Sequence, residues 1–169
     1  YARNYIVYDY NSEEILEGKN YNDTYSVASI SKIMTAILAI ESEKLFNVIV
    51  VDDVIKTIEG SSLYLNVGDK ITIVDLVYGL MLRSGNDAAI IIANEVAGSM
   101  NNFVYLMNQT AMDIGMKNTT FINNHGLEDE DGSGNLSTAY DMAILMKYAM
   151  KNAIFKEISG TKNYTVKTN

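Results

Sequence analysis

The chain has 169 residues, with 13 Lys and Arg against 21 Asp and Glu, and its formal net charge is −8. Hydrophobic residues make up 48% and charged residues 20%, which is ordinary for one globular domain and too apolar for a disordered chain. The acidic balance argues against nucleic-acid binding, which usually needs a basic patch. The absence of Cys excludes disulfides, thiolate metal sites and Cys nucleophiles, and a single His leaves little for a metal site. The residue types that remain as candidates for catalysis are Ser, Thr, Lys, Asp and Glu.

The first part of the chain predicts a strand pair followed by a helix. Residues 5–10 are rich in β-branched and aromatic side chains, and with residues 14–18 they indicate a hairpin. From Ile30 onward, apolar residues recur at helical spacing, which predicts a buried helix over about residues 29–42. The stretch 47–59 is a β-branched mixture whose state stays open. No apolar run approaches the roughly 18 residues of a membrane-spanning helix.

The second part predicts a block of helices separated by capping and turn residues. These expected helices cover residues 72–82, 87–97, about 100–114 and about 138–151. Residues 164–167 look like the start of a returning strand. Two strands, then helices, then a strand is an order typical of an α+β fold. Because two strands alone do not form a stable sheet, we expect further strands toward the C-terminal end or beyond it.

Ser29 and Lys32 form the first candidate reactive pair. They lie three residues apart at a helix start, which places their side chains on neighbouring positions of one face. Partial burial beside the small residues Ala28 and Ala36, together with the helix N-terminus, would lower the pKa of Lys32. A neutral Lys32 could then take the proton from Ser29, and the same helix end favours an oxyanion. Taken alone, Ser-x-x-Lys is a weak pattern, and a capping Ser with a solvent-facing Lys is the alternative.

Ser84-Gly85-Asn86 is the second candidate. It interrupts two apolar helices with a hydroxyl and an amide, and the alternative is a simple connection in which Asn86 caps the next helix. His125 lies in a polar loop and needs no function there. The acidic run 129–135 lacks the Glu that a calcium-binding EF-hand requires at its twelfth position. We therefore expect no metal site and no cofactor.

The two motifs, in this order, resemble those of the serine penicillin-recognising enzymes. The surrounding sequence is similar to the D-alanyl-D-alanine carboxypeptidases of the low-molecular-weight penicillin-binding class. The matching stretches are VASISKIMT at 27–35, LRSGNDAA at 82–89, NTTF at 118–121 with HGL at 125–127, and STAYD at 137–141. The likeness extends over essentially the whole chain, and the combination is specific although each piece alone is not.

This resemblance implies a role for each candidate residue. Ser29 would be the acyl-forming nucleophile, with its backbone N–H as half of the oxyanion hole, and Lys32 would be its base. Ser84 would help pass the proton to the leaving amine, and Asn86 would hydrogen-bond the substrate amide. The implied fold is α+β, a β-lactamase/DD-peptidase-like antiparallel sheet flanked by helices, in a single domain over residues 1–169.

The resemblance also implies substrate and location. The substrate would be a peptidoglycan stem peptide ending in D-Ala-D-Ala, and β-lactam antibiotics would be covalent inhibitors. The protein would act as a secreted enzyme at the extracellular face of the bacterial cell envelope. We expect no nucleic-acid partner, and membrane contact only through a C-terminal anchor absent from this chain.

One departure from the family concerns the third motif, Lys-Thr-Gly, which binds the terminal carboxylate of the substrate. Lys167-Thr168-Asn169 ends in Asn, and in the family a further stretch precedes the true motif, so we interpret this string as a coincidence. We therefore expect an incomplete catalytic domain that lacks the C-terminal strands of the sheet and has little or no activity alone. A class A β-lactamase is disfavoured because no Glu-x-x-Leu-Asn motif occurs. A non-catalytic relative that binds peptidoglycan or a partner, a transpeptidase and an endopeptidase stay open as alternatives.

Overall fold

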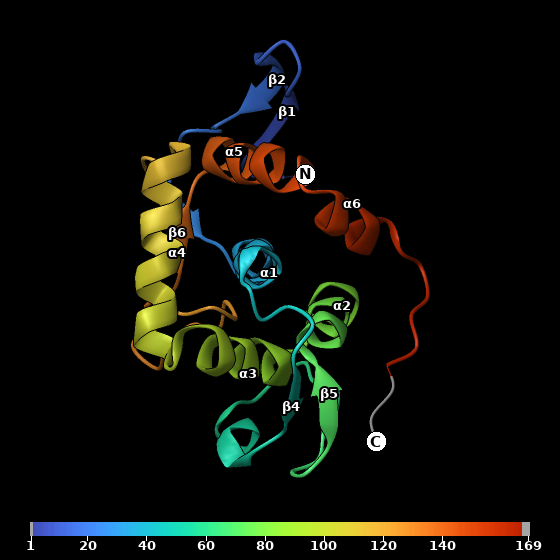
Figure 1. Cartoon of the computed structure of the whole chain (residues 1–169). Helices are drawn as coiled ribbons and strands as arrows, with labels where there is room; N and C mark the ends of the chain where they lie inside the picture. The colour runs from blue at the N-terminus through green and yellow to red at the C-terminus, as the bar shows by residue number, and fades with distance from the viewer. Residues whose placement is uncertain (1, 167–169) are drawn as a thin grey trace.

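The computed structural model describes residues 2–166, which fold as a ring of helices around one central helix (Figure 1). The α-helices are α1 (Lys32–Glu41), α2 (Ile73–Arg83), α3 (Asn86–Ala97), α4 (Met100–Ile114), α5 (Ala139–Met150) and α6 (Ala153–Gly160). Two short 3-10 helices are η1 (Ser29–Ser31) and η2 (Asp53–Thr57). The strands are β1 (Tyr5–Asp9), β2 (Glu14–Lys19), β3 (Tyr25–Ser26), β4 (Val48–Val50), β5 (Lys70–Thr72) and β6 (Leu136–Ser137). None of these helices is long and apolar enough to cross a membrane.

Helix α1 lies at the centre and contacts all five other α-helices. Figure 1 views it nearly end-on, inside the ring that α2 to α6 form. Its side chains are therefore buried on most faces, Met34, Ala36 and Ile37 completely, whereas Ile30 on the preceding η1 is exposed. The expected helix over residues 29–42 thus begins as a 3-10 turn, and its apolar surface is wider than one stripe because neighbours surround it. This central position gives α1 a rigid frame for the side chains at its N-terminus.

The strands form three separate antiparallel pairs, β1–β2, β3–β6 and β4–β5. The first confirms the expected hairpin, and the β-branched stretch of uncertain state divides into β4 and η2. No pair joins another into a larger sheet within residues 2–166. Residues 164–166 are extended but unpaired, so the strand expected there is wrong for its described part. Residues 167–169, which include the Lys167-Thr168 string, lie outside the described residues.

Aromatic packing explains why the C-terminal segment forms no strand. The ring of Tyr164 stacks on Tyr78 of α2 with centroids 3.6 Å apart and an interplanar angle of 3°. The Tyr164 hydroxyl also donates to Asp75 Oδ1 at 2.5 Å. These contacts hold the segment against helix α2.

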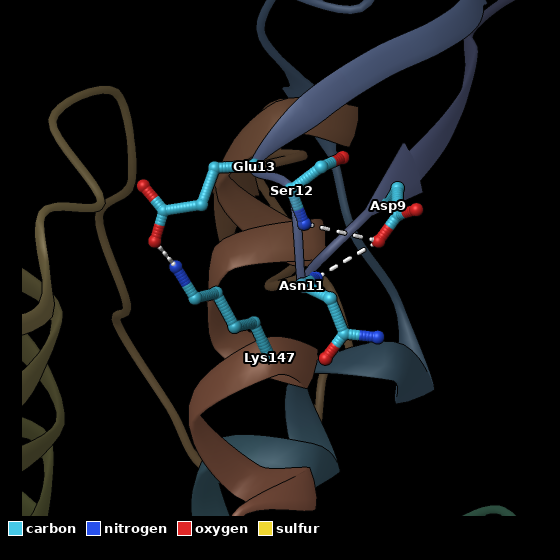
Figure 2. A network of polar contacts seen from close by, with 5 residues as sticks. All are labelled: Asp9, Asn11, Ser12, Glu13 and Lys147. Atoms are coloured by element: carbon cyan, nitrogen blue, oxygen red, sulfur yellow. Dashed lines mark hydrogen bonds and ion pairs between the residues drawn. The ribbon is translucent and has the colours of Figure 1, made fainter.

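An ion pair connects the hairpin turn to α5 (Figure 2). Within the turn, the Asp9 carboxylate accepts from the backbone N–H of Asn11 at 2.9 Å and of Ser12 at 3.3 Å. Glu13 then reaches Lys147 on α5, and this pairing lowers the pKa of Glu13. Between the hairpin and α5 lies an apolar cavity of about 650 Å³, which we call the hairpin groove. Its lining includes Ile6, Tyr8, Val27, Ile30, Met142 and Met146.

Helix α6 is absent from the sequence prediction, which ended the last helix near residue 151. Only two residues separate α6 from α5, so the two helices produce one continuous periodic pattern. The Asn152 side chain begins α6 by accepting from the N–H groups of Ile154 and Phe155. Phe155 and Ile158 are buried against the neighbouring helices and hold this short helix in place.

Replacing Asn152 by Ala should therefore lower the free energy of unfolding by about 1 kcal/mol, because two N–H groups lose their cap. Urea denaturation monitored by circular dichroism measures this change. Asn101 is exposed on α4 and serves as the control, since Asn101→Ala should change stability by only a few tenths of a kcal/mol. Equal losses in both variants would contradict the capping role.

Candidate active site

Ser29 and Lys32 meet at the junction between η1 and α1. The Lys32 Nζ donates to Ser29 Oγ at 3.3 Å and to the backbone carbonyl of His125 at 2.5 Å. Lys32 is only 3% exposed, whereas Ser29 is exposed. The alternative of a solvent-facing Lys is therefore wrong, and the structure brings the predicted nucleophile and base together with the nucleophile open to a ligand.

Burial changes the proton affinity of Lys32. It lowers the pKa of Lys32 from 10.5 to about 8, because the ammonium form loses its hydration inside the domain. The ion pairs formed within residues 2–166 join Lys56 to Asp53 and Lys147 to Glu13, and none of them offsets the buried charge of Lys32. Roughly a tenth of the Lys32 side chains are then neutral at pH 7. A neutral amine beside a hydroxyl can act as a general base.

Ser84 and Asn86 occupy the sharp connection between α2 and α3. Ser84 has φ of 56°, a left-handed conformation that is unusual for a residue with a side chain. Ser84 Oγ and Asn86 Oδ1 are buried, and no hydrogen-bond partner for either occurs in the described part of the chain. Neither side chain is hydrogen-bonded to Ser29 or Lys32. Buried polar atoms without partners and backbone strain concentrate at functional sites, so this connection keeps its place as a candidate.

A neighbouring loop fixes the position of Asn86. The Asn86 side chain donates to the carbonyl of Glu59 at 2.7 Å, and its backbone N–H donates to Ser61 at 2.7 Å. Asp87, which is 3% exposed, accepts from Leu63 N–H at 2.9 Å. Asp87 was not predicted from the sequence. An Asp in the first turn of a helix is usually exposed, and nothing in the Asn86-Asp87 pair indicates that this carboxylate is buried.

A second loop supplies the carbonyl that Lys32 contacts. His125 takes part through its backbone oxygen, which sequence reasoning about the imidazole did not consider. The imidazole Nδ1 accepts from Leu127 N–H at 3.1 Å. Burial, and to a smaller extent the charge of Lys32, lowers the pKa of His125 to about 4, so the ring is neutral at neutral pH.

The acidic run 129–135 forms a turn. Asp131 Oδ1 accepts from the backbone N–H of Ser133 at 2.8 Å, and Asp129 N–H donates to the Ser133 carbonyl. No group of three or more acidic or His side chains with metal-binding geometry occurs among residues 2–166. The Gly and Asp residues of this run therefore serve turn geometry.

Comparison with known proteins identifies the family. All 169 residues match the model of the D-alanyl-D-alanine carboxypeptidase family. The chain is 35% identical over 167 residues to the D-alanyl-D-alanine carboxypeptidase DacF of Bacillus subtilis, which covers 95% of this chain and 42% of that protein. It is 37% identical over 178 residues to DacC of Escherichia coli, covering 96% of this chain and 44% of that protein. The chain thus spans less than half the length of these relatives.

Solved structures agree with this match. A variant of the Streptomyces K15 DD-transpeptidase superposes with a TM-score of 0.92 at 30% identity, covering 99% of this chain and 68% of that one. A D-alanyl-D-alanine carboxypeptidase from Mycobacterium tuberculosis has a TM-score of 0.89 at 29% identity, covering 99% of this chain and 65% of that one. These likenesses confirm the expected α+β, DD-peptidase-like fold. The chain belongs to the D-alanyl-D-alanine carboxypeptidase family.

Proposed function

We propose that this chain supplies the acylation centre of a serine-type D-Ala-D-Ala carboxypeptidase. The observation that carries the proposal is the contact between the exposed Ser29 and the buried Lys32, whose pKa is near 8. Lys32 takes the hydroxyl proton as Ser29 Oγ bonds to the carbonyl carbon of the D-Ala-D-Ala peptide bond. The bond from carbon to nitrogen then breaks, and D-alanine leaves with that proton. Water hydrolyses the ester and regenerates Ser29.

Ser84 and Asn86 complete the proposed centre. Ser84 Oγ would pass the proton from Lys32 to the leaving amine, and Asn86 Oδ1 would accept from the substrate amide. Both atoms are buried without a partner in the described structure. A substrate that supplies the missing hydrogen bonds would remove a cost of about 1–3 kcal/mol for each atom. The same geometry would let a β-lactam acylate Ser29.

The chain is proposed to form an incomplete catalytic domain. Within residues 2–166, β1 pairs with β2 alone, and the apolar hairpin groove opens beside this pair. About a third of the superposed K15 transpeptidase chain lies outside the matched region. Additional strands seated along β1 would bury the groove and complete an antiparallel sheet. Such strands are also where a Lys-Thr-Gly motif for the substrate carboxylate would lie, since the chain itself has no Lys-Thr-Gly string.

The proposed substrate also determines where the protein would act. Peptidoglycan stem peptides ending in D-Ala-D-Ala are exposed outside the cytoplasm, so we place the enzyme at the outer face of the bacterial cell envelope. Secretion, with or without a membrane anchor, is part of this proposal.

D-alanine release tests this function. The full-length protein that carries this chain should release the terminal alanine from a peptide ending in D-Ala-D-Ala, and not from the same peptide ending in D-Ala-L-Ala. Ser29→Ala should abolish release, and Ser12→Ala, at an exposed turn position, should not change it. Tight peptide binding without release would favour the non-catalytic alternative. Release that survives Ser29→Ala would overturn the assignment of the nucleophile.

A further inference from the structure

We infer that Asn123 and Asn135 are positioning residues for Lys32. Their side-chain amides fix the turn of residues 123–127, so that the His125 carbonyl takes one N–H of Lys32 and leaves the lone pair of the neutral amine facing Ser29. This inference rests on the function proposed above, because it concerns how the base of that reaction is aimed.

The amine of Lys32 can act as a base only in one orientation. A neutral amine has two N–H groups and one lone pair, and it must present the lone pair to the Ser29 hydroxyl to accept the proton. The His125 carbonyl, 2.5 Å from Nζ, can only accept, so it necessarily takes an N–H. The second hydrogen-bonding contact of Lys32 Nζ is with Ser29 Oγ, at 3.3 Å. Holding one N–H on the carbonyl therefore limits rotation of the amine about its last bond.

The Asn123 side chain holds the turn that presents this carbonyl. Asn123 Oδ1 accepts from Gly126 N–H at 2.7 Å and from His125 N–H at 3.3 Å. Asn123 Nδ2 donates to the Leu127 carbonyl at 2.8 Å. The Asn123 side chain thus hydrogen-bonds to the backbone of His125 and of the two residues that follow it, next to the carbonyl that Lys32 contacts. Because Asn123 is 6% exposed, water does not compete for these bonds.

The Asn135 side chain connects this turn to η1, which carries the nucleophile. Asn135 Oδ1 accepts from the N–H groups of Ile122 and Asn123, at 2.8 and 3.1 Å. Asn135 Nδ2 donates to the Asn123 carbonyl at 3.0 Å and to Ser31 Oγ at 2.8 Å. Ser31 lies on η1, two residues from Ser29, and its hydroxyl is hydrogen-bonded to the carbonyl of Ala28 at 2.8 Å. Base and carbonyl therefore share one largely buried polar network, and the exposed nucleophile lies at its edge.

The chain offers a matched control in Asn108. Its side chain also bridges a helix to this loop, donating to the Phe121 carbonyl at 2.8 Å and accepting from Phe121 N–H at 2.9 Å. It does not bond to residues 123–127. Loss of Asn108 should therefore loosen the loop start without redirecting the His125 carbonyl.

The test measures how fast a fluorescent penicillin acylates Ser29 in the full-length protein, over a pH range that spans the pKa of Lys32. The titratable group that interacts with Lys32 is His125, which in turn interacts with Asp129. Asn123→Ala should lower the plateau rate by about 100-fold, because a displaced carbonyl no longer orients the amine. Its pH midpoint should fall by about one unit, since the carbonyl bonds more strongly to the ammonium form.

Two further variants separate positioning from general damage. Asn123→Asp keeps the Oδ1 acceptor and should recover the rate to within about tenfold of wild type, while its added charge moves the midpoint upward. Asn108→Ala should keep both the rate and the midpoint. An Asn123→Ala protein with wild-type rate and midpoint, or an Asn108→Ala protein with the same shifts, would overturn the inference.

The test also distinguishes this inference from the proposed function. If wild type forms no Ser29 adduct, the proposed function fails, and the pKa of Lys32 is then measured directly by NMR of labelled lysine side chains. A Lys32 pKa that is the same in wild type and Asn123→Ala would overturn the positioning role on its own. If Asn123→Ala does not fold, Asn135→Ser replaces it, because that variant adds no charge and removes the Nδ2 bonds to Asn123 and Ser31.

Discussion

Replacing Lys32 by Met should lower the rate of Ser29 acylation by about 10³-fold and at the same time make the folded domain more stable. The rate falls because no other amine lies within hydrogen-bonding distance of Ser29 Oγ among the described residues. Lys32→Arg should be equally inactive, since a guanidinium keeps its proton at any working pH. Stopped-flow labelling with a fluorescent penicillin measures these rates.

The stability gain follows from the shifted pKa. A change from 10.5 to about 8 means that the fold disfavours the charged Lys32 by about 3 kcal/mol at pH 7. Met removes this cost but leaves the His125 carbonyl without its donor, a loss of about 1–2 kcal/mol, so the net gain is about 1 kcal/mol.

The pH dependence has a definite sign. Between pH 8 and pH 10.5 the unfolded chain binds more protons at Lys32 than the folded chain, so wild-type stability should rise with pH in this window. Lys32→Met should lack that rise, and Lys117→Met, at an exposed position, should keep it. Wild-type acylation by Lys32→Met, or a loss of its stability at pH 7, would contradict the assignment of Lys32 as a buried base.

Gly126→Ala should be the most disruptive small substitution in the turn beside the nucleophile. A Cβ there would lie 2.2 Å from the Ala28 carbonyl oxygen and 3.0 Å from Ser29 N, both backbone atoms that cannot move aside cheaply. The φ of +85° adds strain for any residue with a side chain. We expect a loss of about 3–5 kcal/mol in the free energy of unfolding. The folded fraction should also acylate more slowly, because Ser29 is pushed out of place.

Gly132 provides the control for backbone strain alone. Its φ of +82° is nearly the same, but a Cβ there meets nothing within 4 Å. Gly132→Ala should therefore cost only about 1 kcal/mol and leave acylation unchanged. Chemical denaturation of both variants separates strain from steric overlap, and equal losses would show that the close approach of Gly126 to η1 has no energetic consequence.

Much of the helical fold could be predicted because its signals are local. Thr72 and Ser99 cap α2 and α4 through bonds to residues three positions later, and Gly115 ends α4 in a left-handed conformation. The strand expected near Tyr164 was wrong because stacking on α2 is a long-range contact that an aromatic, β-branched pattern does not reveal. Pattern alone also could not separate α6 from α5.

The same distinction holds for the site. Ser29 and Lys32 could be paired from sequence because both lie on one helical turn. The carbonyl of His125 could not be predicted as a partner of Lys32, since it lies 93 positions further along the chain and every residue has a carbonyl. Asn123 and Asn135 read as ordinary loop residues, and only the fold brings their side-chain amides into contact. Gly126 lies beside His125 in the predicted polar loop, but its close approach to Ala28 could not be predicted from the sequence.

Intact-mass analysis of the full-length protein after exposure to penicillin shows whether Ser29 is the acylated nucleophile. We expect one covalent adduct per molecule, mapped to Ser29 by peptide digestion, present in Ser12→Ala and absent from Ser29→Ala. A folded wild-type protein that forms no adduct, or an adduct of equal yield in Ser29→Ala, would contradict it.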